Sequence, residues 1–106
     1  MIPSQYITVG RTVYEPVPSL KGGHIIPYII TEVALPYVAF DYQEEYRRTN
    51  AGRGEGGFSS HRDNMENMYV SRAEALHALC DMIKGGLESN FPEWSFDIYP
   101  LEKVPA

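Results

Sequence analysis

One stretch of this sequence has the spacing of an amphipathic helix, while its other apolar stretches are short and rich in β-branched and aromatic residues. The helix is expected to begin at Ser71, because Ser71-Arg72-Ala73-Glu74 is a capping box in which the serine hydroxyl and the glutamate carboxylate satisfy free backbone N–H groups. Gly85 and Gly86 offer an early end, and Phe91-Pro92 stops the helix in either case. The predicted apolar stripe consists of Ala73, Leu76, Cys80, Ile83 and Leu87.

Prolines and glycines separate the stretches that favour strands. The first predicted strand runs from Gln5 to Tyr14, and the second from Tyr28 to Val33, where Pro27 occupies a strand start that tolerates its missing N–H. The last predicted strand runs from Trp94 to Tyr99. The third has the clearest alternation, which places on one face Val38, Phe40, Tyr42, Glu44 and Tyr46.

This pattern predicts a small two-layer α+β domain, in which an antiparallel sheet of three to four strands is covered by one amphipathic helix, in the order β-β-β-α-β. With 106 residues and 43% hydrophobic residues, the chain is expected to form a single domain over residues 1–106. Residues 48–64 hold a run of glycines and arginines and few apolar side chains. They are predicted to form a long flexible loop.

Charge and cysteine content narrow the classes of function. The chain has 14 acidic and 9 basic residues and a formal charge of −5, which disfavours binding of nucleic acid or anionic lipid by the surface as a whole. It has one cysteine, so no disulfide forms within the chain, and its start lacks the apolar stretch of a signal peptide. No apolar run is long enough to span a bilayer. A cytoplasmic protein without membrane contact is therefore expected.

Each constellation that suggests chemistry lacks a necessary part. The glycines between Gly52 and Gly57 match G-x-G-x-x-G, but no apolar helical stripe follows them, so a nucleotide cofactor is not expected. As strand residues, Asp41 and Glu45 would stand roughly 13 Å apart, too far for a catalytic pair. Ser59-Ser60-His61 lacks a group that orients the histidine. His77 and Cys80 lack further ligands at metal-site spacing, so the sequence predicts no metal, no cofactor and no enzymatic activity.

Four arginines gather in residues 46–62, where Glu55 is the one acid. This stretch carries a net charge of +3, which leaves −8 on the rest of a chain whose total is −5. Guanidinium groups suit carboxylates and phosphates alike, and aromatic side chains at both ends of the stretch can fill a partner's pocket. The predicted partner-binding residues are Asp41, Glu45, Tyr46, Arg47, Arg48, Arg53, Phe58 and Arg62.

The sequence thus predicts a non-enzymatic protein-binding module. Within that class we expect a small acidic inhibitor or adaptor of the kind that bacteriophages and mobile elements make, which blocks a surface of another protein, itself one that binds nucleic acid. In this reading Asp41, Glu45, Asp81 and Glu88 imitate phosphates. The alternative is direct contact between nucleic acid and the arginine-rich loop, residues 47–62. The sequence leaves the identity of the partner and the oligomeric state open.

Overall fold

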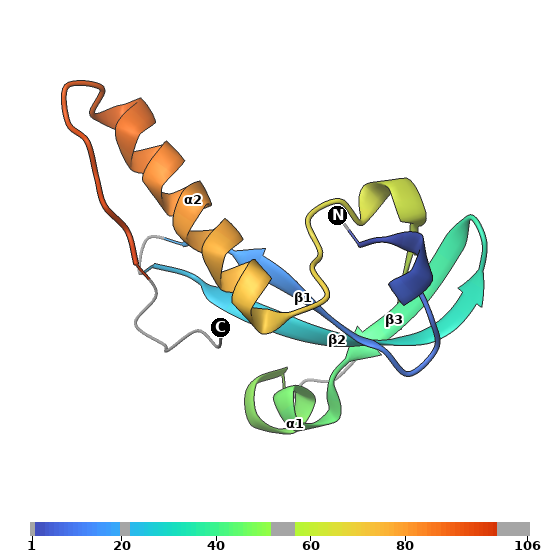
Figure 1. Ribbon diagram of the computed structural model, residues 1–106. Helices are drawn as coiled ribbons and strands as arrows, with labels where there is room; N and C mark the ends of the chain where they lie inside the picture. Colours follow the sequence, from blue (N-terminus) through green and yellow to red (C-terminus); the bar gives the residue numbers. More distant parts are fainter. Residues whose placement is uncertain (1, 20–21, 52–56, 100–106) are drawn as a thin grey trace.

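The computed structural model describes residues 2–19, 22–51 and 57–99 (Figure 1). Four antiparallel strands form one sheet in the order β1-β2-β3-β4. A long helix, α2 (Arg72–Asn90), lies across β1 and β2, and a short helical turn, α1 (Glu44–Tyr46), continues into a π-helical turn (Arg47–Ala51). Single 3₁₀ turns cover Ser4–Tyr6 and Arg62–Asn64. The strands are β1 (Thr12–Val17), β2 (His24–Ala34), β3 (Tyr37–Tyr42) and β4 (Phe58–His61).

The predicted α+β class, with an antiparallel sheet and one long helix, is confirmed. The order β-β-β-α-β is also found, but its last two members are α1 and β4 and not the segments from which the order was predicted. Residues 94–99 form no strand. The fourth strand instead lies inside the predicted flexible loop, because Phe58 pairs with Phe40 and buries its ring on the same face of the sheet.

The first strand begins later than predicted and runs through a proline. The backbone of Tyr14 exchanges two hydrogen bonds with Tyr69, at 2.8 and 2.9 Å, on the side of β1 that faces away from β2. Pro16 lies two residues further along, so its missing N–H faces the same outer side and costs no hydrogen bond of the ladder. This arrangement makes β1 an edge strand that tolerates proline.

The third strand ends at Tyr42 for a reason that lies in the neighbouring strand. The carbonyl of Pro27 accepts a hydrogen bond from the N–H of Gln43 at 3.0 Å, but proline has no N–H to return. The Gln43 carbonyl accepts instead from the N–H of Arg47 at 2.9 Å, and Gln43 Oε1 caps the N–H of Tyr46 at 3.0 Å. The chain therefore turns into α1, and Glu44 and Tyr46 do not share the strand face, contrary to the prediction.

Strand register divides the core between the two faces of the sheet. Val13, Tyr28 and Phe40 lie on one face, as the pairings Val13↔Tyr28 and Ile30↔Phe40 and the alternation along β2 require. Ile25 and Tyr14 lie on the other face, where α2 packs. The first face carries the larger cluster, whose buried members are Ile2, Ile7, Val13, Tyr28, Ile30, Val38, Phe40, Met65 and Met68.

The helix begins and ends as predicted, with Ser71 Oγ accepting from the N–H of Glu74 at 3.2 Å and Phe91 at the C-cap. Its buried face is rotated from the predicted stripe, because β1 and β2 meet the side that carries Ala75, Leu76 and Leu79. Cys80 and Leu87, expected in the stripe, are half-buried.

None of the helices in the described residues is long and apolar enough to cross a membrane.

Candidate functional site

Phe58, one of the predicted contact residues, belongs to an aromatic cluster on the sheet. Its ring centroid lies 5.1 Å from that of Tyr42, 5.7 Å from Tyr28 and 5.8 Å from Phe40. Tyr46 extends this cluster from α1, with its ring centroid 5.6 Å from that of Tyr42. Rings at these distances contribute to stability through burial and edge-to-face contacts. Phe58 and Tyr46 therefore pack β4 and α1 onto the sheet.

Arg47 and Asp41 are also engaged with each other. Arg47 Nη2 donates to Asp41 Oδ1, and the same oxygen accepts from the N–H of Tyr42 at 2.7 Å. Arg47 Nε is buried and has no hydrogen-bond partner among the described residues. The ion pair ties the first turn after β3 back to the strand. It neutralises two charges that the sequence assigned to partner contact.

The remaining predicted charges are dispersed over the molecule. Glu45 and Arg48 are exposed near α1, and Glu45 does not share a strand face with Asp41, because the chain has already left the sheet. Arg53 lies outside the described residues. Arg62 lies in the 3₁₀ turn after β4, away from α1 in Figure 1, and donates to Ser4 Oγ. The described arginines thus do not form one basic patch.

Two further acids were predicted as phosphate mimics on the helix. Asp81 is exposed, whereas Glu88 is half-buried. Both lie on α2, on the far side of the molecule from Glu45 (Figure 1). The four predicted mimics therefore do not line one surface.

Exposed aromatic side chains follow the helix, and Trp94 and Tyr99 among them lie in the segment that the sequence predicted as a strand. Trp94 is 68% exposed, Tyr99 is 77% exposed and Phe91 is 53% exposed. The Phe91 ring centroid lies 6.5 Å from that of the half-buried Phe96. We call Phe91, Trp94 and Tyr99 the C-terminal aromatic surface. The alternation of Trp94, Phe96 and Ile98 predicts a half-buried strand. The sequence carries no signal that the sheet ends before it reaches this segment.

The C-terminal half of α2 carries this surface away from the sheet. Figure 1 shows the helix projecting beyond β1 and β2, with the segment after Asn90 running back alongside it. The Cα radius of gyration is 15.1 Å, compared with about 13 Å for a compact chain of this length. From Cys80 onward the helix has no fully buried side chain. Its second half therefore lacks a core of its own.

The described residues include a serine beside a histidine, Ser60 and His61, and the single cysteine, Cys80. Ser60 Oγ donates to the His61 carbonyl at 3.1 Å, and His61 Nδ1 accepts from the N–H of Asp63 at 3.2 Å, so no hydrogen bond joins this hydroxyl to the imidazole. Burial, and then the charge of Asp81, raises the pKa of the Cys80 thiol, which keeps it protonated and weakly nucleophilic. In the described ranges no three His, Cys, Asp or Glu side chains converge as metal ligands would.

Comparison of the chain with protein-family models, with curated proteins and with solved structures finds no match.

Proposed function

We propose that this protein is a non-enzymatic protein-binding module whose partner covers the C-terminal aromatic surface. The exposure of Trp94, 68% of its side chain and backbone surface, carries this proposal. Tryptophan and tyrosine are enriched among the residues that dominate binding energy at protein interfaces. They supply a large rigid contact area and lose little conformational entropy when they are covered.

The position of these side chains favours a macromolecular partner over a small ligand. Trp94 and Tyr99 lie in a segment without regular secondary structure beside the projecting half of α2, where Met82, Ile83 and Leu87 are only half-buried. Exposed apolar side chains that lie together are a recurrent mark of protein interfaces, and the segment after Asn90 runs alongside this half of the helix (Figure 1). A partner that packs there would complete the missing cover of the helix.

The charge favours a basic partner. With −5 on the whole chain and exposed carboxylates at Glu45 and Asp81, electrostatic attraction would steer a positively charged protein toward the molecule. We therefore place the protein among small acidic inhibitors or adaptors, as bacteriophages and mobile elements make, acting in the cytoplasm on a partner that binds nucleic acid. The ion pair of Arg47 with Asp41 supports this reading over direct nucleic-acid contact.

The test is affinity capture with the whole chain immobilised as wild type and as Trp94→Ala. Nuclease-treated lysate of the source cells is passed over each, and the retained proteins are quantified by mass spectrometry. Tyr37→Ala is the matched control, because Tyr37 is 59% exposed at the distant β2–β3 turn. We expect a protein that wild type and Tyr37→Ala retain equally and that Trp94→Ala retains at least about tenfold less.

A second measurement separates this function from the nucleic-acid alternative. Labelled single-stranded and duplex oligonucleotides are titrated with the protein at about 50 mM and about 200 mM salt. Tight binding that weakens steeply with salt and is lost in Arg47→Ala/Arg48→Ala would contradict the proposal. Equal retention of every captured protein by wild type and Trp94→Ala would contradict it as well. Trp94 is the one tryptophan of the chain, so its emission also reports a purified partner directly.

A further inference from the structure

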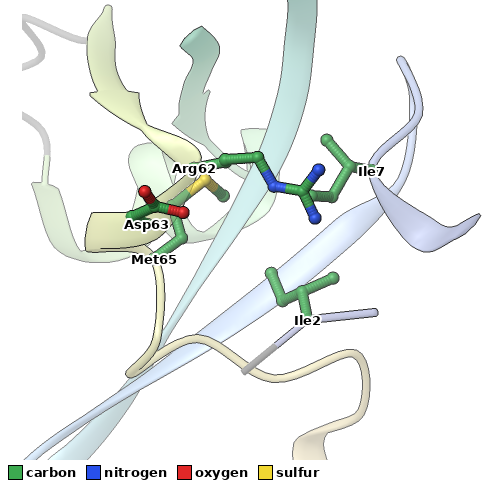
Figure 2. Close-up of a pocket in the computed structure, with 5 residues that line it drawn as sticks. All are labelled: Ile2, Ile7, Arg62, Asp63 and Met65. Carbon is green, nitrogen blue, oxygen red and sulfur yellow. The ribbon is translucent and has the colours of Figure 1, made fainter. Parts of the chain in front are cut away.

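A small hollow lies where the N-terminal segment meets the turn after β4. Its volume is about 270 Å³, and its lining combines Ile2, Ile7 and Met65 with the polar side chains of Arg62 and Asp63 (Figure 2). The three apolar side chains are 4%, 9% and 2% exposed, so they form a fixed floor that belongs to the core. Figure 2 shows the Arg62 guanidinium reaching over this floor toward Ile7.

The guanidinium retains capacity for an anion. Its hydrogen bond to a described residue is the one that Nη2 donates to Ser4 Oγ, and four of its five N–H groups have no acceptor among the described residues. Ser4 is not among the side chains that line the hollow, so the recognition of an anion there rests on the guanidinium. Arg62 offers paired donors of the kind that recognise a planar carboxylate.

Asp63 limits the charge that such a ligand can carry. Figure 2 shows its carboxylate apart from the guanidinium, and the carboxylate lies 3.5 Å from His61 Nδ1. It nevertheless lines the same hollow, and its negative charge repels a second negative charge on a ligand. A monocarboxylate is therefore favoured over a phosphate dianion.

We propose that this hollow binds a monocarboxylate with a compact apolar group, with the carboxylate on Arg62 and the apolar group against Ile2, Ile7 and Met65. A dry cavity of about 150 Å³ holds benzene, and sites for drug-sized ligands begin near 300 Å³. A volume of about 270 Å³ thus suits a group the size of a leucine side chain or a little larger. Such a carboxylate comes from a free short-chain acid or from the C-terminal residue of a peptide.

This site is independent of the C-terminal aromatic surface. It lies on the N-terminal side of the molecule, whereas α2 carries the aromatic surface to the opposite end (Figure 1). Loss of one function by mutation therefore leaves the other measurable.

The experiment is a titration of the whole chain followed by NMR of isotope-labelled Ile δ1 and Met ε methyl groups. The probes are 4-methylpentanoate, its uncharged amide, inorganic phosphate, and the dipeptide N-acetyl-Ala-Leu as free acid and as amide. We expect saturable shifts of the Ile2, Ile7 and Met65 methyl groups with 4-methylpentanoate, with a dissociation constant on the order of 1 mM. The amide and phosphate are expected to bind at least about tenfold more weakly.

Variants assign the charge recognition to one arginine. Arg62→Gln is expected to weaken the acid at least about tenfold, whereas Arg48→Gln, which removes an exposed arginine elsewhere, leaves its affinity unchanged. If Arg62→Gln perturbs the N-terminal segment, the comparison of acid and amide on the wild-type protein still decides. Tighter binding of the dipeptide acid identifies a peptide C-terminus as the source, and its failure identifies a free acid. Equal binding of acid and amide, or shifts confined to other methyl groups, would overturn the site.

Discussion

Tyr28 on β2 donates its hydroxyl hydrogen to Glu15 Oε1 on β1 at 2.9 Å, on the face of the sheet that carries the aromatic cluster. Burial raises the pKa of the Tyr28 hydroxyl, and the hydrogen bond to Glu15 and the charge of that carboxylate raise it further. The protonated hydroxyl is thus a structural donor, which links a charged side chain of the edge strand to the core.

This bond predicts a loss of stability at high pH. In the unfolded chain Tyr28 ionises near its ordinary pKa of about 10, whereas the folded protein keeps the proton to higher pH. The contribution of Tyr28 is therefore complete below about pH 10 and is lost as the pH rises toward the folded pKa. Urea denaturation between about pH 7 and pH 11 should show this decline. Tyr28→Phe should be about 1–2 kcal/mol less stable at pH 7, with a flatter decline above pH 10. An equally steep alkaline decline in Tyr28→Phe would contradict the assignment.

Gly23 and Gly22 offer a matched pair of substitutions before β2. Both have positive φ, of 99° and 105°, so alanine is strained at either position. A Cβ at Gly23 would overlap the carbonyl oxygen of Val17 and lie 2.9 Å from Leu79 Cδ1, whereas a Cβ at Gly22 would meet nothing within 4 Å. Gly23→Ala should therefore cost about 3 kcal/mol or more and Gly22→Ala about 1 kcal/mol, measured by urea denaturation. Equal costs would show that this close approach of β1, β2 and α2 is absent.

The helix register is tested by two leucines. Leu79 is 7% exposed and packs with Ile25, whereas Leu87 lies in the projecting half of α2 and is half-buried. Leu79→Ala should lower the free energy of unfolding by about 2–4 kcal/mol, because it leaves a cavity against the sheet. Leu87→Ala should cost less than about 1 kcal/mol. A larger loss of stability in Leu87→Ala than in Leu79→Ala would support the apolar stripe that the sequence predicted.

Local rules predicted what local interactions decide. Ser71 caps the helix through its own side chain, and Val38 and Phe40 alternate into the core, so both were readable from a few neighbouring residues. The end of β3 depends on the proline opposite it. Pro27 lies sixteen positions before Gln43 in the sequence. Only the pairing of β2 with β3 places Pro27, which has no N–H, opposite the carbonyl of Gln43.

The candidate contact residues were harder to predict than the fold, because exposure depends on which elements meet. Phe58 stands among glycines and polar residues, which resembles a loop, yet it packs on Phe40 and Tyr42. Trp94 has the alternation of a buried strand, yet no strand pairs with its segment in the described residues. Both errors arise because a hydrophobic pattern states which side chains can be buried and not whether a partner surface exists.

Phe58 and Phe91 test whether the packed ring serves stability and the exposed ring serves binding. Phe58 contacts three aromatic rings, so Phe58→Ala should cost about 2–4 kcal/mol of stability and loosen β4. Phe91 is 53% exposed, so Phe91→Ala should cost less than about 1 kcal/mol. Circular dichroism at increasing urea is the suitable measurement, because the exposed Trp94 reports folding poorly. In the capture assay the order should invert, with folded Phe58→Ala retaining the partner and Phe91→Ala losing it. A stable Phe58→Ala variant that fails to bind the partner would show that Phe58 belongs to the contact surface.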